Sequence, residues 1–231
     1  DTAVNLDEFI RKRVAKLPET ARRLLTVVSV AGGRIPRSVA LDVVGESMDR
    51  ALMGQLRAGH LLRGDGEASS DGLLETYHDR VREAVVDGLD AGARKPLHAA
   101  IATTLEAAGE GDAELLTEHY LLAGRNADAA RQAHVALDHA EQSWAFDRAA
   151  AMCRLLLELE ARSEQERVAL LERLATALES AGRGQEAATV YAQAADLSSG
   201  EQRRTFLRGA AQQLMWSGGF DRGREVLWTA L

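Results

Sequence analysis

Residues 73–84 read LLETYHDRVREA, in which a short apolar run leads directly into a His-Asp pair and then into an amphipathic helical pattern. A polar, glycine-containing segment, residues 64–72, precedes this stretch, and another short run, Leu61-Leu62-Arg63, precedes that segment. Two short apolar runs joined by a glycine-containing turn predict a β-hairpin. We therefore expect a hairpin over about residues 61–77, followed by a helix that begins next to His78 and Asp79.

Four amphipathic helical patterns come before the hairpin. The first covers residues 5–15 and should turn Phe9 toward a core. The other three are expected to begin near Pro18, Pro36 and Ser47, and to end at Gly32, Gly45 and Gly59. The second is apolar around most of its surface, so it should be central to the core. Compact helices followed by a hairpin predict a winged-helix domain over residues 1–90.

After residue 78 only helical patterns remain. The expected spans are 79–89, 94–109, 112–123, 126–142, 145–160, 164–181, 184–197, 201–217 and 220–231. Similar motifs begin at Trp144, Gly182 and Gly218, at spacings of 38 and 36 residues, close to the roughly 34-residue period of tetratricopeptide repeats. Each motif lies at the start of the second helix of a pair, and a small residue follows a few positions after the turn. We predict that residues 91–231 form an α-α superhelix of tetratricopeptide-type helical hairpins, truncated at the C-terminus.

Local patterns in this second part make three further predictions. Capping boxes are expected to start helices at Ser163 and Ser199. The apolar stripe of the helix 164–181 should be buried between hairpins, and it consists of Val168, Leu171, Leu174 and Leu178. The helix 220–231 has an apolar face with no helix after it, which predicts an interaction site and a possible homodimer through this truncated helix.

The composition favours helices and limits the classes of partner. Hydrophobic residues make up 46% of the chain but aromatic residues only 4%, which favours packed helices over a β-sandwich. The single cysteine fits a reducing compartment, and neither a signal peptide nor about 20 consecutive apolar residues are found. A cytoplasmic location is therefore expected. The net charge of −7 makes a phosphate backbone a poor partner. Because the chain lacks an initiator Met, we interpret it as a fragment of a larger protein.

Two interpretations of His78 and Asp79 are open. In the first, Asp79 caps the following helix and His78 fills space at the base of the hairpin. In the second, His78 donates a hydrogen bond to a nucleotide phosphate held by a neighbouring domain, since histidine titrates near neutral pH. The chain has no G-x-x-x-x-G-K-[ST] loop. No cofactor is therefore expected in this chain, and ATP or ADP would bind in an upstream module.

The other polar groups do not predict an enzyme or a metal site. His60 and His98 are isolated in the sequence, and His134 and His139 are five positions apart, a spacing that does not place two zinc ligands on one helix face. Cys153 lies in an apolar stripe, where cysteine behaves as a small hydrophobic residue. No catalytic residue and no metal ligand are expected.

A winged helix raises DNA binding as an alternative. The helix before the hairpin would present Arg50, Gln55 and Arg57 outward. The hairpin tip at residues 64–67 is acidic, however, and would repel a phosphate backbone. DNA is therefore a disfavoured partner.

The order of several short motifs resembles that of a known bacterial architecture. The motifs are LPETARRLL at 17–25, SVAG at 29–32, YHDRVREA at 77–84, EHYLLAG at 118–124 and AFDRA at 145–149. They resemble the region after the ATPase module of large bacterial signalling proteins, in which a STAND-type (AAA-like) NTPase precedes a winged helix and tetratricopeptide repeats. Such proteins include serine/threonine protein kinases with an ATPase module and large helix-turn-helix transcriptional activators. The motif AGR at 181–183 resembles the kinase group more.

Tyr77-His78-Asp79 resembles the Met-His-Asp signature of STAND winged-helix domains, with Tyr77 in place of the Met. In that family the histidine contacts the β-phosphate of bound ADP and favours the closed, inactive state. The resemblance therefore implies that His78 and Asp79 sense a nucleotide, but only together with the ATPase module.

We expect a non-catalytic regulatory and protein-interaction region of a bacterial multidomain signalling protein. It would couple a nucleotide-switch ATPase module in the same polypeptide to a repeat array that binds a protein or peptide partner. The chain itself is not expected to be an enzyme or to bind a membrane, whereas the full-length protein would carry a serine/threonine kinase domain, an ATPase domain or both. The alternatives are a DNA-binding winged-helix transcription regulator and a structural spacer.

Overall fold

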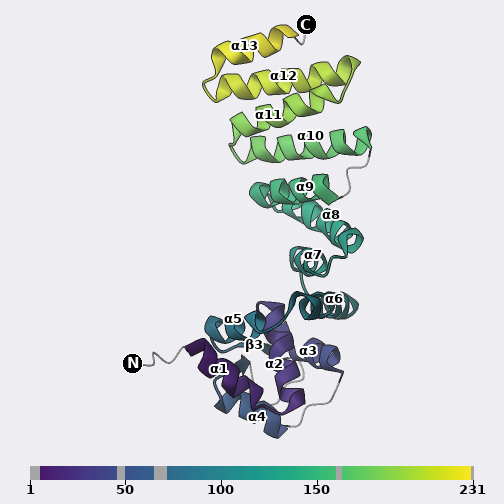
Figure 1. Cartoon of the computed structure of the whole chain (residues 1–231). Helices are drawn as coiled ribbons and strands as arrows, with labels where there is room; N and C mark the ends of the chain where they lie inside the picture. The colour runs from purple at the N-terminus through teal and green to yellow at the C-terminus, as the bar shows by residue number, and fades with distance from the viewer. Residues whose placement is uncertain (1–5, 46–49, 65–71, 160–162, 230–231) are drawn as a thin grey trace. The chain divides into compact units, whose positions relative to one another are not determined.

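The computed structural model describes residues 6–45, 50–64, 72–159 and 163–229. This part of the chain contains 13 helices and one small antiparallel sheet (Figure 1). The mainly helical fold class with a small β-hairpin, expected from the sequence, is thereby confirmed. The chain divides into two compact units, Asp1–Arg125 and Asn126–Leu231.

The first unit contains seven helices and three strands among its described residues. They are α1 (Leu6–Ala15), α2 (Glu19–Ala31), β1 (Ile35–Pro36), α3 (Arg37–Val44), α4 (Arg50–Ala58), β2 (Leu62–Gly64), β3 (Leu73–Thr76), α5 (Asp79–Asp87), α6 (Ala91–Ala107) and α7 (Ala113–Leu122). Helix α6 packs against α2 and α3. For this reason α6 and α7, which were expected to belong with the repeats from residue 91, lie in the first unit.

The expected hairpin is present as strands β2 and β3. They pair antiparallel, with Leu62 opposite Thr76 and Gly64 opposite Leu74. A third strand, β1, pairs with the other edge of β3. The sequence did not reveal β1, because it is only two residues long and its second residue, Pro36, is also the N-cap of helix α3. The hairpin tip, including the acidic positions 65–67, lies outside the described residues.

Helix α2 forms the centre of the first unit, as its apolar surface predicts. Leu24, Leu25 and Val28 are fully buried, and α2 packs against α3, α4, α5 and α6. Gly32 ends the helix in the left-handed conformation, with φ of 77°, which glycine adopts without steric cost. On α1, by contrast, the expectation for Phe9 is wrong, because its side chain is 53% exposed.

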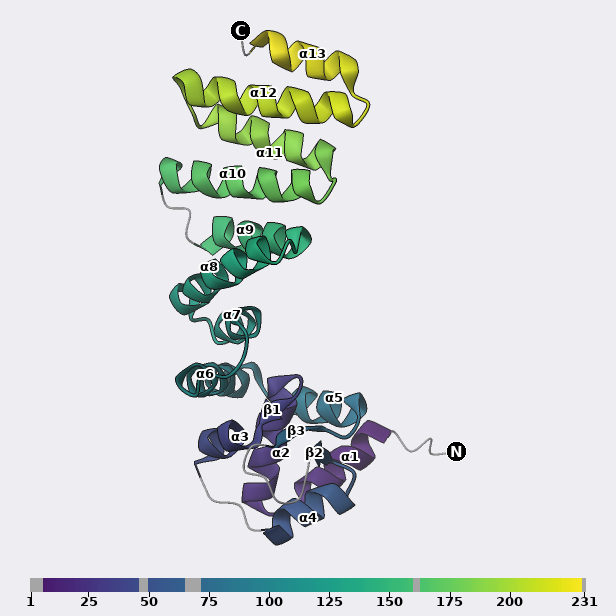
Figure 2. The same cartoon turned by 180° about the vertical axis from the view of Figure 1, so that it is seen from behind.

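The second unit contains six helices among its described residues. They are α8 (Asn126–Gln142), α9 (Phe146–Leu159), α10 (Glu164–Ser180), α11 (Gly184–Asp196), α12 (Gly200–Trp216) and α13 (Phe220–Thr229). From α9 to α13, each helix packs against the helix before it in the chain. Seen from both sides, α10 to α13 form a regular stack of antiparallel helices (Figure 2).

The sequence motif at Trp144, Gly182 and Gly218 corresponds to a repeated turn. All three residues have positive φ, 60°, 73° and 89° respectively. In each turn the backbone N–H of this residue donates to the carbonyl three positions earlier, at 3.0–3.2 Å. The turns of the hairpins α8–α9, α10–α11 and α12–α13 therefore share one geometry. Glycine supplies it twice, whereas Trp144 adopts a conformation that ordinary side chains disfavour.

The small residues after these turns allow close helix packing, as expected. Ala149 and Ala187 are fully buried. At Gly223 an added Cβ would lie 2.6 Å from Cγ of Met215 and 2.9 Å from the carbonyl oxygen of Ala211. Helix α13 can therefore approach α12 this closely only because residue 223 has no side chain.

The local predictions for the second unit had mixed outcomes. At Ser163 both hydrogen bonds of the capping box are present: Glu166 N–H donates to the serine hydroxyl, and Ser163 N–H donates to the Glu166 carboxylate. The capping box at Ser199 is wrong, because its side chain accepts no capping hydrogen bond. The apolar stripe of α10 is buried as expected, with exposed fractions between 0% and 6%.

The apolar face expected on the last helix is divided in the structure. Phe220 and Trp228 are 69% and 70% exposed, whereas Val226 packs against the hydrophobic core of the second unit. Part of this face is therefore already covered within the unit, and two aromatic rings of α13 remain in solvent.

Candidate functional site

His78 lies at the junction between strand β3 and helix α5. Its backbone is extended, with φ of −143° and ψ of 150°, and it occupies the position just before the helix. The side chains of His78 and Asp79 are both exposed. The expectation that Asp79 caps the helix is wrong, because Asp79 is the first helical residue and His78 holds the cap position without a capping hydrogen bond from its side chain.

The His78 ring is held by an aromatic neighbour. Tyr77 meets it edge-on, with ring centroids 4.7 Å apart, and on another side meets His60 at 4.8 Å. The backbone N–H of Tyr77 donates to the Leu61 carbonyl at 3.0 Å, which ties this residue to the start of the hairpin. The His78 ring is therefore exposed and contacts Tyr77 outside the buried core of the first unit.

The His78 imidazole is available to an external acceptor. Among the described residues its ring nitrogens make no hydrogen bond, and Asp79 forms no ion pair. The nearest basic residue in the sequence, Arg80, is engaged with Asp7 at 3.1 Å and more distantly with Glu83. The site can therefore donate a hydrogen bond from one imidazole, while Asp79 limits how strongly it attracts an anion.

The three residues of α4 that were considered for contacts with DNA bases are not all exposed. Arg50 and Gln55 are exposed on α4. Arg57 is half-buried, and its Nε is enclosed without a hydrogen bond of its own. This arrangement adds no basic stripe to an acidic chain.

Cys153 and the histidines can be placed directly. Cys153 is fully buried in α9, and burial raises the pKa of its thiol to about 12, which leaves it unreactive at neutral pH. His139 is exposed and His134 half-buried on α8. Within the described ranges, no group of three or more His, Cys, Asp or Glu side chains is placed to hold a metal ion.

Sequence reasoning missed one histidine pair. His98 on α6 and His119 on α7, treated as unrelated, face each other with 2.9 Å between their Nδ1 atoms. His119 is only 3% exposed, and its burial, together with His98, lowers its pKa to about 4 despite a backbone hydrogen bond with Ala31. The two rings meet only because of how helices α6 and α7 align in their hairpin. The spacing of residues within either helix does not predict this contact.

A second candidate site lies along helix α10. Three adjoining hollows of about 500, 540 and 290 Å³ follow its exposed side. Ala169 and Arg173 line both the first and the second hollow, and Glu172 and Thr176 line both the second and the third. We call these three hollows the α10 groove.

The charges of the α10 groove are mostly acidic. Arg173 is committed to α8, because it donates to both carboxylate oxygens of Glu141 at 2.9 and 2.7 Å and to Asp138 at 2.6 Å. These bonds raise the pKa of the Arg173 guanidinium. Glu172 is exposed and forms no ion pair among the described residues. Further along, the carboxylate of Glu179 accepts a hydrogen bond from Tyr191.

Two aromatic residues lie at the α8–α9 turn, beside the middle hollow. Phe146 lines that hollow, and Trp144 meets it edge-on with ring centroids 6.0 Å apart. Trp144 is 78% exposed and holds the left-handed backbone described above. A large exposed ring at a strained position is unfavourable for folding alone, and such outliers concentrate at functional sites.

No protein-family model matches the chain, and neither a curated protein nor a solved structure matches it at a significant level. Within the described residues, no helix has both the length and the apolar character needed to cross a membrane.

Proposed function

We propose that this chain is a non-catalytic regulatory and protein-interaction region of a bacterial multidomain signalling protein, located in the cytoplasm. The three-stranded sheet and helices of the first unit would be a winged-helix domain, and the hairpins of the second unit would belong to a tetratricopeptide-type superhelix. The winged helix would couple an ATPase module in the same polypeptide to the repeats, so that the bound nucleotide affects them. The repeats would bind a protein or peptide partner.

The observation that carries this proposal is the α10 groove with Trp144 at its edge. A few residues provide most of the binding energy in many protein interfaces, and tryptophan is enriched among them. Phe146 and the unpaired carboxylate of Glu172 line the groove, and Trp144 meets the Phe146 ring edge-on. Its natural partner is therefore a segment that carries an aliphatic or aromatic anchor next to a lysine or arginine.

The regulatory part of the proposal rests on His78. Its ring is exposed, is oriented by Tyr77 and makes no hydrogen bond among the described residues. A phosphate oxygen presented by an adjacent ATPase module would be a suitable acceptor. The nucleotide can shift the switch only if it binds the two conformations with different affinities, and a hydrogen bond from His78 in one of them supplies that difference.

Peptide selection against the whole chain tests the partner-binding role. A display library should yield peptides in which a basic residue lies next to an apolar anchor. The same selection against Glu172→Lys should lose the basic preference, whereas Glu158→Lys, an equally exposed substitution on α9, should retain it. Failure to enrich any peptide class would favour the structural spacer, and salt-dependent duplex binding with no peptide selection would favour the DNA-binding alternative.

The exposed Phe220 and Trp228 of α13 support a second contact, a homodimer through this helix. Light scattering over a range of concentrations tests it. A mass that stays at one chain throughout, with Trp228 still exposed, would exclude the dimer.

A further inference from the structure

The first unit contains a cavity of about 750 Å³. Its lining comes from the end of α2, the loop that leads to β1, and helices α5, α6 and α7. This volume lies within the range of small-molecule sites. Nothing in the proposed role of His78, or in the α10 groove, involves this cavity.

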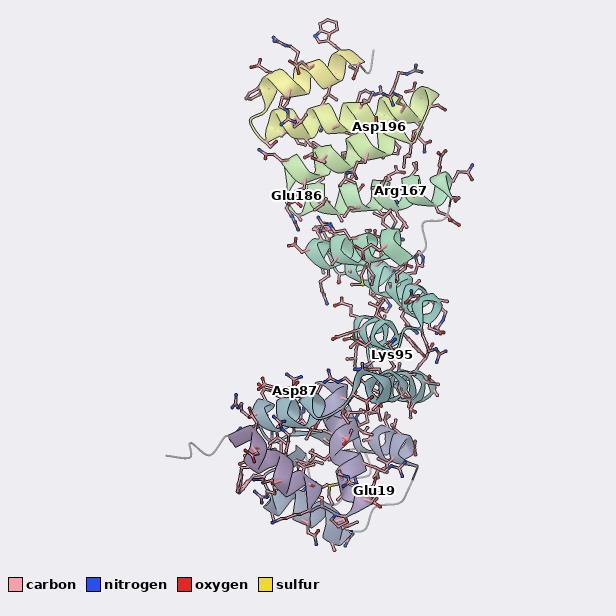
Figure 3. All side chains as sticks on the ribbon, viewed as in Figure 1. Glu19, Asp87, Lys95, Arg167, Glu186 and Asp196 are labelled. Atoms are coloured by element: carbon pink, nitrogen blue, oxygen red, sulfur yellow. The ribbon has the colours of Figure 1, made fainter. Side chains whose placement is uncertain are left out.

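Basic side chains gather around this cavity although the chain as a whole is acidic. Arg34, Arg82, Arg94 and Lys95 all line it, and Lys95 lies on α6 (Figure 3). Among the described residues neither Arg82 nor Lys95 forms an ion pair. Arg94 uses its Nε to donate to the Leu89 carbonyl at 3.1 Å, a bond to a neutral acceptor that leaves the positive charge uncompensated.

Two acidic residues, Asp112 and Glu118, also line the cavity and offset only part of the charge of its four basic residues. Asp112 is occupied as the cap of α7, where its carboxylate accepts from Leu115 N–H at 2.7 Å. Glu118 is exposed on α7 and acts on His98 through its charge. Arg34 lies near Glu75, 3.8 Å away. With four basic residues against two acidic ones, the lining carries an excess of positive charge, and Arg82 and Lys95 form no ion pair among the described residues.

The histidine pair adds a proton-dependent charge to the same cavity, which both rings line. Across the 2.9 Å contact, one histidine donates a hydrogen bond from its Nδ1 and the other accepts it. The Nε2 of the donating ring can still take up a proton, so the pair can gain one positive charge without losing this hydrogen bond. His119 is buried and also hydrogen-bonds the Ala31 backbone. His98 is half-buried, so the added proton is best accommodated on His98.

We propose that this cavity binds a small molecule that carries a phosphate group, with Arg82 and Lys95 as the charged contacts and protonated His98 as a further donor. Arginine and lysine form the strongest hydrogen bonds to phosphate oxygens. Burial lowers the pKa of His98 in the free protein, and the negative charge of a bound anion would stabilise the protonated ring against this effect. Affinity should therefore rise as the pH falls.

Calorimetry on the whole chain at low ionic strength tests this proposal, with inorganic phosphate and sulfate as probes. Both should bind. Arg82→Gln and Lys95→Gln should each weaken binding by about tenfold or more. Lys12→Gln is the matched control, because Lys12 is an exposed lysine on α1, outside the cavity, and should bind like the wild type. Both cavity variants change exposed or half-exposed side chains, so they should fold.

Sulfate separates the role of His98 from the titration of the ligand, because the charge of sulfate does not change between about pH 6 and pH 8. The wild type should bind sulfate more tightly at the lower pH, and His98→Gln should remove this dependence. The proposal is overturned by a lack of binding of either anion at about 10 mM, by equal losses in Lys12→Gln and Lys95→Gln, or by pH-independent binding of sulfate to the wild type. None of these results bears on partner binding at the α10 groove.

Discussion

The Nδ1 atoms of His98 and His119 lie 2.9 Å apart, although 21 positions separate these residues in the chain. This contact joins α6 to α7. His119 also forms a hydrogen bond with the backbone of Ala31, which joins α7 to the end of α2. A buried, mostly neutral imidazole therefore links three helices of the first unit.

This link predicts acid sensitivity. The pKa of His119 is lowered from 6.5 to about 4 by burial, so between these values the unfolded chain binds a proton that the folded chain excludes. Stability contributed by neutral His119 is complete above pH 6.5 and is lost as the pH falls toward 4. The loss should approach about 3 kcal/mol.

Urea unfolding of the first unit at pH 7.5 and at pH 5 measures this effect. His119→Gln should reduce the difference between the two pH values, while His139→Gln, which changes an exposed histidine on α8, should leave it intact. A wild type that is equally stable at both pH values would show that His119 is not the buried neutral group described here.

The packing of the second unit predicts the cost of shortening Leu174. This side chain is 4% exposed within the stripe of α10, and Leu174→Ala should lower the free energy of unfolding by about 2–5 kcal/mol. Thr176→Ala, at an exposed position on the same helix, should change it by less than about 0.5 kcal/mol. A small loss at Leu174 would mean that the stripe does not face the core.

Gly223 and Gly54 form a matched pair for testing the contact between α12 and α13. Both lie inside helices, where alanine normally stabilises by about 1 kcal/mol. Gly54→Ala should do so, because an added Cβ meets nothing within 4 Å. Gly223→Ala should instead loosen α13, because the Cβ would overlap the backbone oxygen of Ala211. Hydrogen exchange of the α13 amides measures this, and slower exchange in Gly223→Ala would contradict the close contact.

The nucleotide switch makes a prediction for a polypeptide that includes the ATPase module. His78→Ala should weaken ADP binding by about tenfold or more, because a charge-assisted hydrogen bond contributes about 1.5–3 kcal/mol, and should raise basal output. Asp79→Ala should have a smaller effect, because this side chain only favours the start of α5 through the helix dipole. His139→Ala serves as the control. Unchanged ADP affinity in His78→Ala would remove the sensor role.

Local patterns predicted much of the fold. Helix α8 begins and ends where its apolar periodicity does, and the turn motif at Trp144, Gly182 and Gly218 predicted three equivalent turns. Capping and periodicity are encoded within a few neighbouring residues. The strand at Ile35–Pro36 was not predictable in this way, because only its pairing with β3 makes it a strand.

The candidate sites were predictable only in part. The position of His78 follows from the hairpin and the helix next to it, but the contact with Tyr77 and the missing cap do not. The His98–His119 pair depends on how α6 and α7 align, and the α10 groove depends on the stacking of three hairpins. Such sites arise from contacts between residues far apart in the chain.

The α10 groove is proposed to bind a partner segment through Trp144 and Glu172. The most direct measurement is the affinity of one selected basic peptide for the wild type, Trp144→Gly, Glu172→Lys and Glu158→Lys. Glycine at position 144 relieves the left-handed strain, so Trp144→Gly should be at least as stable as the wild type yet bind about tenfold or more weakly. Glu172→Lys should also lose binding, and Glu158→Lys should keep it. Equal affinity of all four proteins would contradict the claim.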